Sequence, residues 1–85
     1  MMENKFSQNV IIYTTPTCPD CRQLKEWLTK MHIPFEERDL TDPHIMAEAK
    51  ASTGVRVAPI TLIGDKVFYG TFISQKPDLI VALGL

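Results

Sequence analysis

Residues 9–31 read NVIIYTTPTCPDCRQLKEWLTKM and contain both cysteines of the chain, Cys18 and Cys21. Val10–Thr14 is an almost continuous apolar run, which is typical of a central parallel strand covered on both faces. In Pro19–Met31 the apolar residues recur at helical spacing. Proline suits the first position of such a helix, because its missing N–H would have no partner there. The sequence therefore predicts a strand, a short loop and a helix, with Cys18 at or near the helix N-cap.

The two cysteines are expected to have different tasks. At an N-cap, the sulfur of Cys18 would lie close to unpaired backbone N–H groups and to the positive end of the helix dipole. Such a position favours the thiolate, which is the nucleophilic form. We expect Cys18 to be the more exposed and to attack a disulfide, and Cys21 to resolve the mixed disulfide. A C-x-x-C pair that follows a strand and opens a helix is a strong indication of this chemistry.

A zinc site and a structural disulfide are less favoured roles for the cysteine pair. Half of a zinc site would need two more ligands, and the only histidines, His32 and His44, have a spacing that fits no common zinc finger. A purely structural disulfide that closes so short a loop would constrain the unfolded chain little. We therefore expect a redox pair and no metal site.

The length and composition indicate one domain, residues 1–85, with a polar extension at residues 1–8. The formal net charge of −1 gives no electrostatic reason to expect binding to nucleic acid or to an anionic membrane. Residues 1–8 do not read as a leader segment, and no apolar run is long enough to span a membrane. We expect a monomeric, cytoplasmic protein, because a C-x-x-C pair is usually kept reduced in that compartment.

Further strands and helices follow the first pair. In chain order they are a strand at Ile33–Leu40, a helix from Pro43 to Gly54, strands at Ile60–Ile63 and Val67–Tyr69, and a last helix from Ser74 or Gln75 to Gly84, with Pro77 in its first turn. A strand–helix–strand opening gives a parallel pair with a right-handed crossover. The short turn between the last two strands gives an antiparallel hairpin. The order β-α-β-α-β-β-α predicts an α/β fold with a four-stranded mixed sheet flanked by three helices.

Three motifs carry a resemblance to a known family. They are CPDC at residues 18–21, TGVRVAP at residues 53–59, and the hairpin with its following glycine at residues 64–70. On these motifs, and over nearly its whole length, the chain resembles the glutaredoxins, which have the thioredoxin fold. The resemblance implies a dithiol–disulfide oxidoreductase. It also implies a cis Ala58–Pro59 bond beside the cysteines and an Ala58 backbone that pairs with an extended substrate or with glutathione.

The chain departs from the glutathione-using members at three places. They usually have an aromatic residue where this chain has Asp20, and a lysine where it has Thr15. They typically have Gly-Gly and a small or acidic pair where this chain has residues 69–72, YGTF. Glycine followed closely by phenylalanine is more similar to the NrdH-type redoxins, which donate to ribonucleotide reductase and are recharged by thioredoxin reductase. Thr14-Thr15 is similar to the mycoredoxins, which use another low-molecular-weight thiol.

The reductant therefore stays open between glutathione, another low-molecular-weight thiol and thioredoxin reductase. No bound cofactor is expected. The expected partner is a disulfide-containing protein, such as ribonucleotide reductase or a peroxidase. The residues expected to contact substrate or thiol belong to three segments of the sequence, one of which contains the cysteine pair. They are Thr15, Pro19, Asp20, Ala58, Pro59, Tyr69, Gly70, Thr71 and Phe72.

Some charged and aromatic residues have two interpretations. The Asp20 carboxylate opposes a thiolate on Cys18, unless the N-terminus of the cysteine helix or a basic neighbour, Arg22 or Lys25, compensates it. Arg56 either contacts an anionic substrate or is a solvated charge. Two aromatic residues also have alternatives: Trp27 is expected to pack in the core, and Tyr13 either flanks the site or packs.

Two rival functions belong to different classes. Some glutaredoxins hold an iron–sulfur cluster between two chains through the first cysteine of each and two glutathiones. Pro19 and the altered glutathione positions disfavour this function here. The second rival is a non-catalytic partner-binding module, which the intact cysteine pair disfavours.

Overall fold

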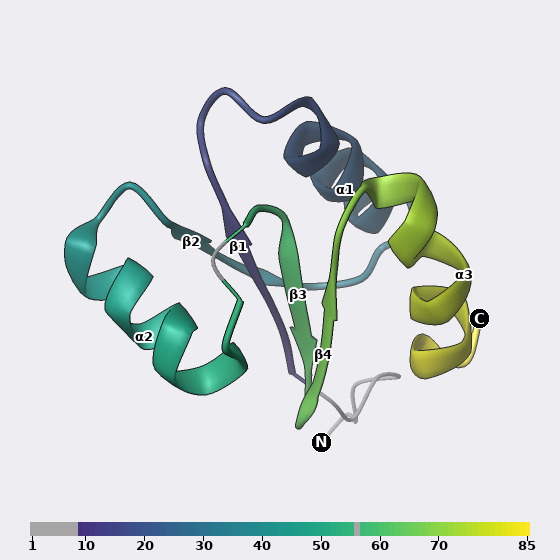
Figure 1. Cartoon of the computed structure of the whole chain (residues 1–85). Coiled ribbons are helices and arrows are strands. Elements are labelled where there is room, and N and C mark those ends of the chain that lie inside the picture. The colour runs from purple at the N-terminus through teal and green to yellow at the C-terminus, as the bar shows by residue number, and fades with distance from the viewer. Residues whose placement is uncertain (1–8, 56) are drawn as a thin grey trace, which may run out of the picture.

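The structure is a computed structural model, and it describes residues 9–55 and 57–85 (Figure 1). The expected extension at residues 1–8 and the alternatives for Arg56 lie outside the described residues. Seven elements follow one another in the expected order. They are β1 (Val10–Thr14), α1 (Pro19–Lys30), β2 (Glu36–Asp39), α2 (Pro43–Thr53), β3 (Ile60–Ile63), β4 (Lys66–Tyr69) and α3 (Phe72–Leu83).

The four strands form one mixed sheet in the order β2-β1-β3-β4. β1 is parallel to β2, and α1 forms the crossover between them. β3 is antiparallel to both β1 and β4, and a two-residue turn at Gly64 and Asp65 joins β3 to β4. These pairings confirm the predicted α/β fold and its element order.

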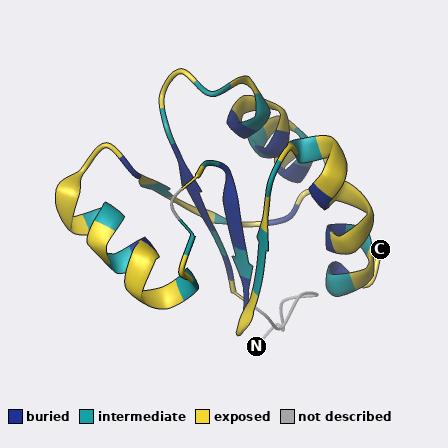
Figure 2. Ribbon diagram, viewed as in Figure 1, coloured by how far each residue is buried: buried dark blue, intermediate teal, exposed yellow. Residues whose placement is uncertain are grey.

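The helices cover both faces of the sheet, with α1 and α3 on one face and α2 on the other (Figure 1). The alternation of side chains along β1 explains this arrangement. Val10 and Ile12 pack with the buried leucines of α1 and α3, whereas Tyr13 packs with Ala49 of α2 and with Leu40. β1 is an apolar run because it is central and its two faces are both covered, and Figure 2 shows its buried residues in the middle of the molecule.

The ends of α2 follow the signals in the sequence. The Asp42 side chain caps the helix and accepts a hydrogen bond from the His44 N–H at 2.8 Å. Pro43 takes the first helical position. Gly54 ends the helix with φ of 74°, a left-handed conformation that glycine adopts without a Cβ clash.

Several predicted boundaries are wrong, among them the end of α1, expected at Met31, and the start of β4, which is Lys66 instead of Val67. β2 covers only Glu36–Asp39 rather than Ile33–Leu40, because it is a short edge strand that begins after Pro34, which has no N–H for the ladder. α3 begins at Phe72, not at Ser74 or Gln75, and Pro77 therefore lies inside the helix instead of in its first turn. The α1 helix ends at Lys30, and Met31, its C-cap, is 39% exposed.

Within residues 9–55 and 57–85, no helix has the length and apolar character that a membrane span requires.

Candidate active site

The sheet register brings three loops to one end of the sheet. Tyr13 of β1 pairs with Ile60 of β3, and Ile60 pairs with Tyr69 of β4. The residues after β1, before β3 and after β4 therefore lie at the same edge. These segments are the cysteine loop, the Ala58–Pro59 segment and residues 70–72, so the fold gathers the three segments in which the sequence placed the candidate site.

Cys18 is the N-cap residue of α1, as the sequence predicts. Its backbone is extended, with φ of −91° and ψ of 113°, and its Sγ accepts a hydrogen bond from the Cys21 N–H at 3.2 Å. Pro19 occupies the first turn behind it. The loop before the helix is closed by the carbonyl of Thr15, which accepts from the Cys18 N–H at 3.4 Å. A backbone donor aimed at Sγ at the positive end of a helix stabilises negative charge on that sulfur.

Cys21 lies one turn further on in a different environment. Both cysteines are free thiols, Cys18 half-buried and Cys21 only 1% exposed. Burial, reinforced by the neighbouring Cys18 sulfur, raises the pKa of the Cys21 thiol to about 12. Cys21 is therefore protonated at neutral pH, whereas Cys18 is the thiol that an outside disulfide can reach. This asymmetry is what an attacking and a resolving thiol require.

The Ala58–Pro59 peptide bond is cis, as the resemblance implies. Pro59 is buried, Ala58 is half-buried and Val57 before them is 58% exposed. Pro59, directly before β3, has no backbone N–H. Any backbone donor in this segment therefore belongs to the residues that precede it.

Gln75 is a buried part of the site that our reading of the sequence missed. It is 2% exposed and lies on the same face of α3 as Leu79 and Leu83. Its Nε2 donates to the carbonyls of Pro59 at 3.0 Å and Gly70 at 2.9 Å, and its Oε1 accepts from the Thr61 hydroxyl at 2.7 Å. One amide therefore connects β3 and the Pro59 loop to the loop that follows β4. An amide on an otherwise apolar helical face was the signal that could have identified it.

Asp20 connects the two helices that meet at the site. Its Oδ1 accepts a hydrogen bond from the Phe72 N–H at 3.1 Å, although the two residues are 52 positions apart. The donor belongs to the N-terminus of α3, which was not among the expected alternatives for Asp20. Lys25 instead forms an ion pair with Glu37, at 3.0 Å.

The last residue of β4 and the residues that follow it have distinct environments. Tyr69 is 60% exposed, and Thr71 is the N-cap of α3, with its hydroxyl accepting from the Ser74 N–H at 3.2 Å. Gly70 has φ of 108°, and a Cβ there would lie 3.0 Å from the Ser74 hydroxyl. Phe72 is half-buried and packs its ring against Trp27, with centroids 5.9 Å apart. Tyr69 is therefore more open to a partner than Phe72, and Trp27 is a packing residue.

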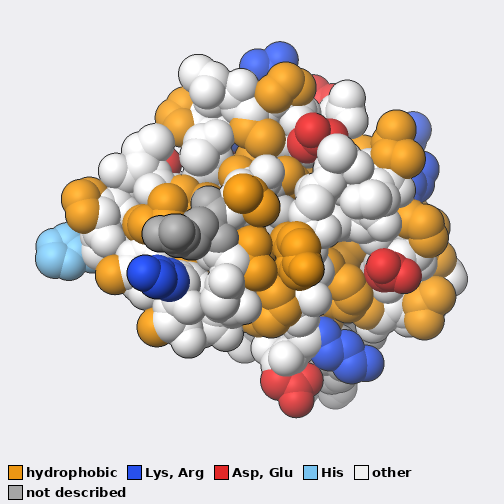
Figure 3. Space-filling model, in the orientation of Figure 1, with side chains coloured by type: hydrophobic (Ala, Val, Ile, Leu, Met, Phe, Trp, Pro, Cys, Tyr) orange, Lys and Arg blue, Asp and Glu red, His pale blue; other side chains and the backbone are white. Residues whose placement is uncertain are grey.

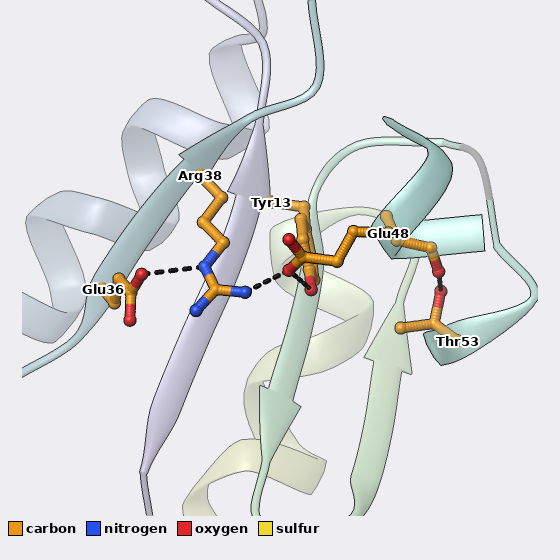
Figure 4. Close-up of polar contacts among 6 residues, drawn as sticks. Tyr13, Glu36, Arg38, Glu48 and Thr53 are labelled. Atoms are coloured by element: carbon orange, nitrogen blue, oxygen red, sulfur yellow. Dashed lines mark hydrogen bonds and ion pairs between the residues drawn. The ribbon is translucent and has the colours of Figure 1, made fainter. Parts of the chain in front are cut away.

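Tyr13 packs on the α2 side of the sheet, away from the cysteine helix. Its hydroxyl donates to Glu48 at 2.8 Å, and Arg38 bonds the same carboxylate and also that of Glu36 (Figure 4). The carbonyl of Ala49 in the same helix accepts from the Thr53 hydroxyl. Burial, followed by the contact with Glu48, raises the pKa of Tyr13. Of the two alternatives for Tyr13, the structure shows packing.

The described part of the chain contains no cluster of three or more His, Cys, Asp or Glu side chains that could hold a metal ion.

Known proteins with similar sequences place the chain in one family. The model of the glutaredoxin family matches residues 10–68. The chain belongs to the glutaredoxin family. Its relatives include the glutaredoxin-like protein NrdH of Lactococcus lactis subsp. lactis (strain IL1403), 30% identical over 61 residues that cover 72% of this chain and 85% of that protein. The family assignment supports thiol–disulfide oxidoreductase chemistry in general terms.

Some relatives share only a segment. The global transcriptional regulator Spx 2 of the same Lactococcus strain is 51% identical over 35 residues, which cover 40% of this chain. This chain spans only 26% of the length of that regulator.

Solved structures confirm the fold of this glutaredoxin-family chain. The thioredoxin-like protein BC3987 has a TM-score of 0.75 and 26% identity, over 84% of this chain and 99% of that one. The glutaredoxin of Archaeoglobus fulgidus has a TM-score of 0.72 and 23% identity, over 93% of this chain and 96% of that one. Together with the mixed sheet and its three helices, these likenesses show the thioredoxin fold.

Proposed function

We propose that this chain is a cytoplasmic dithiol–disulfide oxidoreductase that reduces protein or small-molecule disulfides with Cys18 and Cys21. The observation that supports the proposal is the asymmetry of the pair. The Cys18 sulfur accepts the Cys21 N–H at the start of α1, and the Cys21 thiol is buried and protonated.

The reaction proceeds in two exchanges. The Cys18 thiolate attacks one sulfur of the substrate disulfide, a new S–S bond forms, and the other sulfur leaves as a thiolate that takes a proton from water. Cys21 then loses its proton to water and attacks the Cys18 sulfur. The Cys18–Cys21 disulfide forms, and the second substrate sulfur leaves and is protonated. The substrate gains two electrons, and the chain loses two.

The chain must then be reduced again by an outside donor. We propose that no bound cofactor takes part and that the donor is glutathione, another low-molecular-weight thiol, or thioredoxin reductase. The likeness to an NrdH protein and the departures at Thr15 and residues 69–72 favour thioredoxin reductase. A disulfide-containing protein, such as ribonucleotide reductase or a peroxidase, is the proposed substrate.

The test is an NADPH-consumption assay with hydroxyethyl disulfide in two arms. One arm contains thioredoxin reductase, and the other contains glutathione with glutathione reductase. We expect turnover in the first arm, none with the Cys18→Ser variant, and a trapped mixed disulfide with Cys21→Ser that mass spectrometry detects. Activity of the Cys18→Ser variant would overturn the assignment of the nucleophile. Turnover only in the glutathione arm would identify glutathione as the donor.

The match to a segment of proteins named global transcriptional regulators favours a second candidate, a module that binds a partner instead of turning over. Its cysteine pair would change oxidation state once per event. Multiple turnovers in the same assay exclude this candidate, whereas a single stoichiometric oxidation of the pair supports it.

A further inference from the structure

We propose that Asp20 is a specificity-determining residue that disfavours anionic disulfides at Cys18 relative to neutral and cationic ones. The inference rests on the proposed function, because it concerns which disulfides Cys18 attacks. It follows from where the Asp20 carboxylate lies and from which backbone groups it occupies.

Asp20 lies in the first turn of α1, between the two cysteines. Its carboxylate reaches across to the first residue of α3 and accepts the Phe72 N–H at 3.1 Å. One carboxylate in the first turn of α1, the turn that follows the N-cap Cys18, therefore contacts the amino-terminal end of α3. This contact is half-buried, so the charge is held in place and is not a freely moving surface group.

The N-termini of α1 and α3 would by themselves attract anions. Each carries the positive end of a helix dipole, roughly half an elementary charge, together with unpaired N–H groups. Here the chain occupies these groups with its own atoms. The Asp20 carboxylate accepts a hydrogen bond from the Phe72 N–H. The Thr71 hydroxyl accepts one from the Ser74 N–H, and the Cys18 sulfur accepts one from the Cys21 N–H. An incoming carboxylate therefore meets a fixed negative charge at the place where it would otherwise find donors.

Among the described residues, the basic side chains near Asp20 in the sequence or on α3 do not reverse this sign. Arg22 is exposed, so solvent screens its charge. The Lys25 ammonium is paired with Glu37 at 3.0 Å, and Lys76 lies over the Phe72 ring with its ammonium 5.9 Å from the ring centroid. Lys76 is exposed to solvent, which screens its charge. On the face seen in Figure 3, hydrophobic side chains gather over the middle of the molecule, and the charged groups lie mostly around them. The exposed apolar residues near the sheet end include Val57 and Tyr69.

A purely structural role for Asp20, as a cap for α3, makes a different prediction. Asparagine keeps the acceptor oxygen for the Phe72 N–H and removes the charge. The Asp20→Asn variant therefore separates the charge from the hydrogen bond, and Asp20→Ala removes both. Asp65→Asn is the matched control, because Asp65 is an exposed carboxylate in the turn between β3 and β4, at the opposite end of the sheet (Figure 1).

The experiment uses three small symmetrical disulfides that differ in charge: dithiodipropionate, hydroxyethyl disulfide and cystamine. Each is mixed with Cys21→Ser protein, and mass spectrometry of quenched samples gives the rate constant for mixed-disulfide formation at Cys18. We expect Asp20→Asn to raise the anionic-to-neutral ratio of rate constants roughly three- to tenfold, as one unit charge does across a solvated site. The cationic-to-neutral ratio should fall, and Asp65→Asn should leave both ratios unchanged.

The ratios separate the charge from any change in the reactivity of Cys18, because a change in reactivity moves all three rate constants by one factor. Such a common factor in Asp20→Asn would overturn the proposal. Salt supplies a second measurement: the anionic-to-neutral ratio should rise more steeply with ionic strength in the Cys21→Ser protein than in the same protein with Asp20→Asn, because the Cys18 thiolate repels anions in both. Equal salt dependence of the two proteins would contradict the proposal. Failure of even hydroxyethyl disulfide to react would refute the proposed function itself.

Discussion

Replacing Gln75 by methionine should destabilise the protein by roughly 3 kcal/mol. Methionine is unbranched and of similar size, so the substitution removes hydrogen bonds with little change in packing. The carbonyls of Pro59 and Gly70 lose their donor, and the Thr61 hydroxyl loses its acceptor. Each buried polar group left without a partner costs about 1–3 kcal/mol, and the greater apolar burial of methionine offsets about 1 kcal/mol.

The measurement is urea unfolding, with thermal unfolding as a second readout. A loss of about 3 kcal/mol lowers the Tm of a domain of this size by roughly 12–24 °C. Thr61→Val is the matched variant, because it removes one of the three bonds, and we expect a loss of about 1–2 kcal/mol. The double variant should lose less than the sum, since both substitutions break the same bond between Thr61 and Gln75. A loss below about 1 kcal/mol for Gln75→Met, or strict additivity, would refute this account of the network.

Two further predictions concern ionisable groups. In the Cys18→Ser variant, burial alone should keep the pKa of the Cys21 thiol raised. The rate of its alkylation by iodoacetamide, followed by mass spectrometry, should therefore continue to increase with pH above 9. A rate that reaches a plateau near the ordinary thiol pKa of about 8.5 would contradict the burial argument. The hydrogen bond from Thr14, at 2.7 Å, and the ion pair with Lys25 lower the pKa of Glu37. A lowered folded-state pKa contributes stability that is present above the unfolded value of about 4.3 and is lost as pH falls through the folded value. Thermal unfolding from pH 7 to pH 3 should therefore show a steeper loss for the wild type than for Glu37→Gln, and parallel curves would exclude this contribution.

Local signals in the sequence predicted most of the fold. The β1 strand is apolar because both of its faces are covered, and α2 begins and ends at the expected capping residues, Asp42 and Gly54. The cysteine helix also begins where its proline predicts. In each case the decisive interaction lies within a few residues, so a short window of sequence contains the necessary information.

The start of α3 was predicted wrongly because its determinants are partly distant in the chain. Pro77 is a strong local signal for a first turn, and it displaced the expected start to Ser74 or Gln75. In the structure the helix begins at Phe72, whose N–H is accepted by Asp20 from 52 positions away. The local cap, Thr71, was assigned only a contact with substrate or thiol. No local pattern links two residues so far apart, so the partnership between Asp20 and α3 could not be predicted.

The candidate site divides in the same way. The dithiol and the residues around Pro59 could be identified from motifs, because each motif consists of residues that are close together in the sequence. Gln75 could not, since its partners belong to two loops whose proximity only the sheet register establishes. The role of a buried amide can be assigned only when the positions of its hydrogen-bond partners are known.

The first turns of α3 are the common anchor of the three loops that form the site. Asp20 attaches the cysteine helix to Phe72, and Gln75, one turn further on, attaches the Pro59 loop and the Gly70 loop. The apolar clusters on the two faces of the sheet hold the elements together without direction, since hydrophobic burial depends on area and not on orientation. Hydrogen bonds depend on orientation, and at the sheet end that carries the dithiol they join α3 to each of the three loops. The sheet register brings Cys18 and Pro59 to one edge, and these hydrogen bonds fix their segments to α3, an element that contains neither residue. The sensitivity of the site to substitutions in α3 follows from that connection.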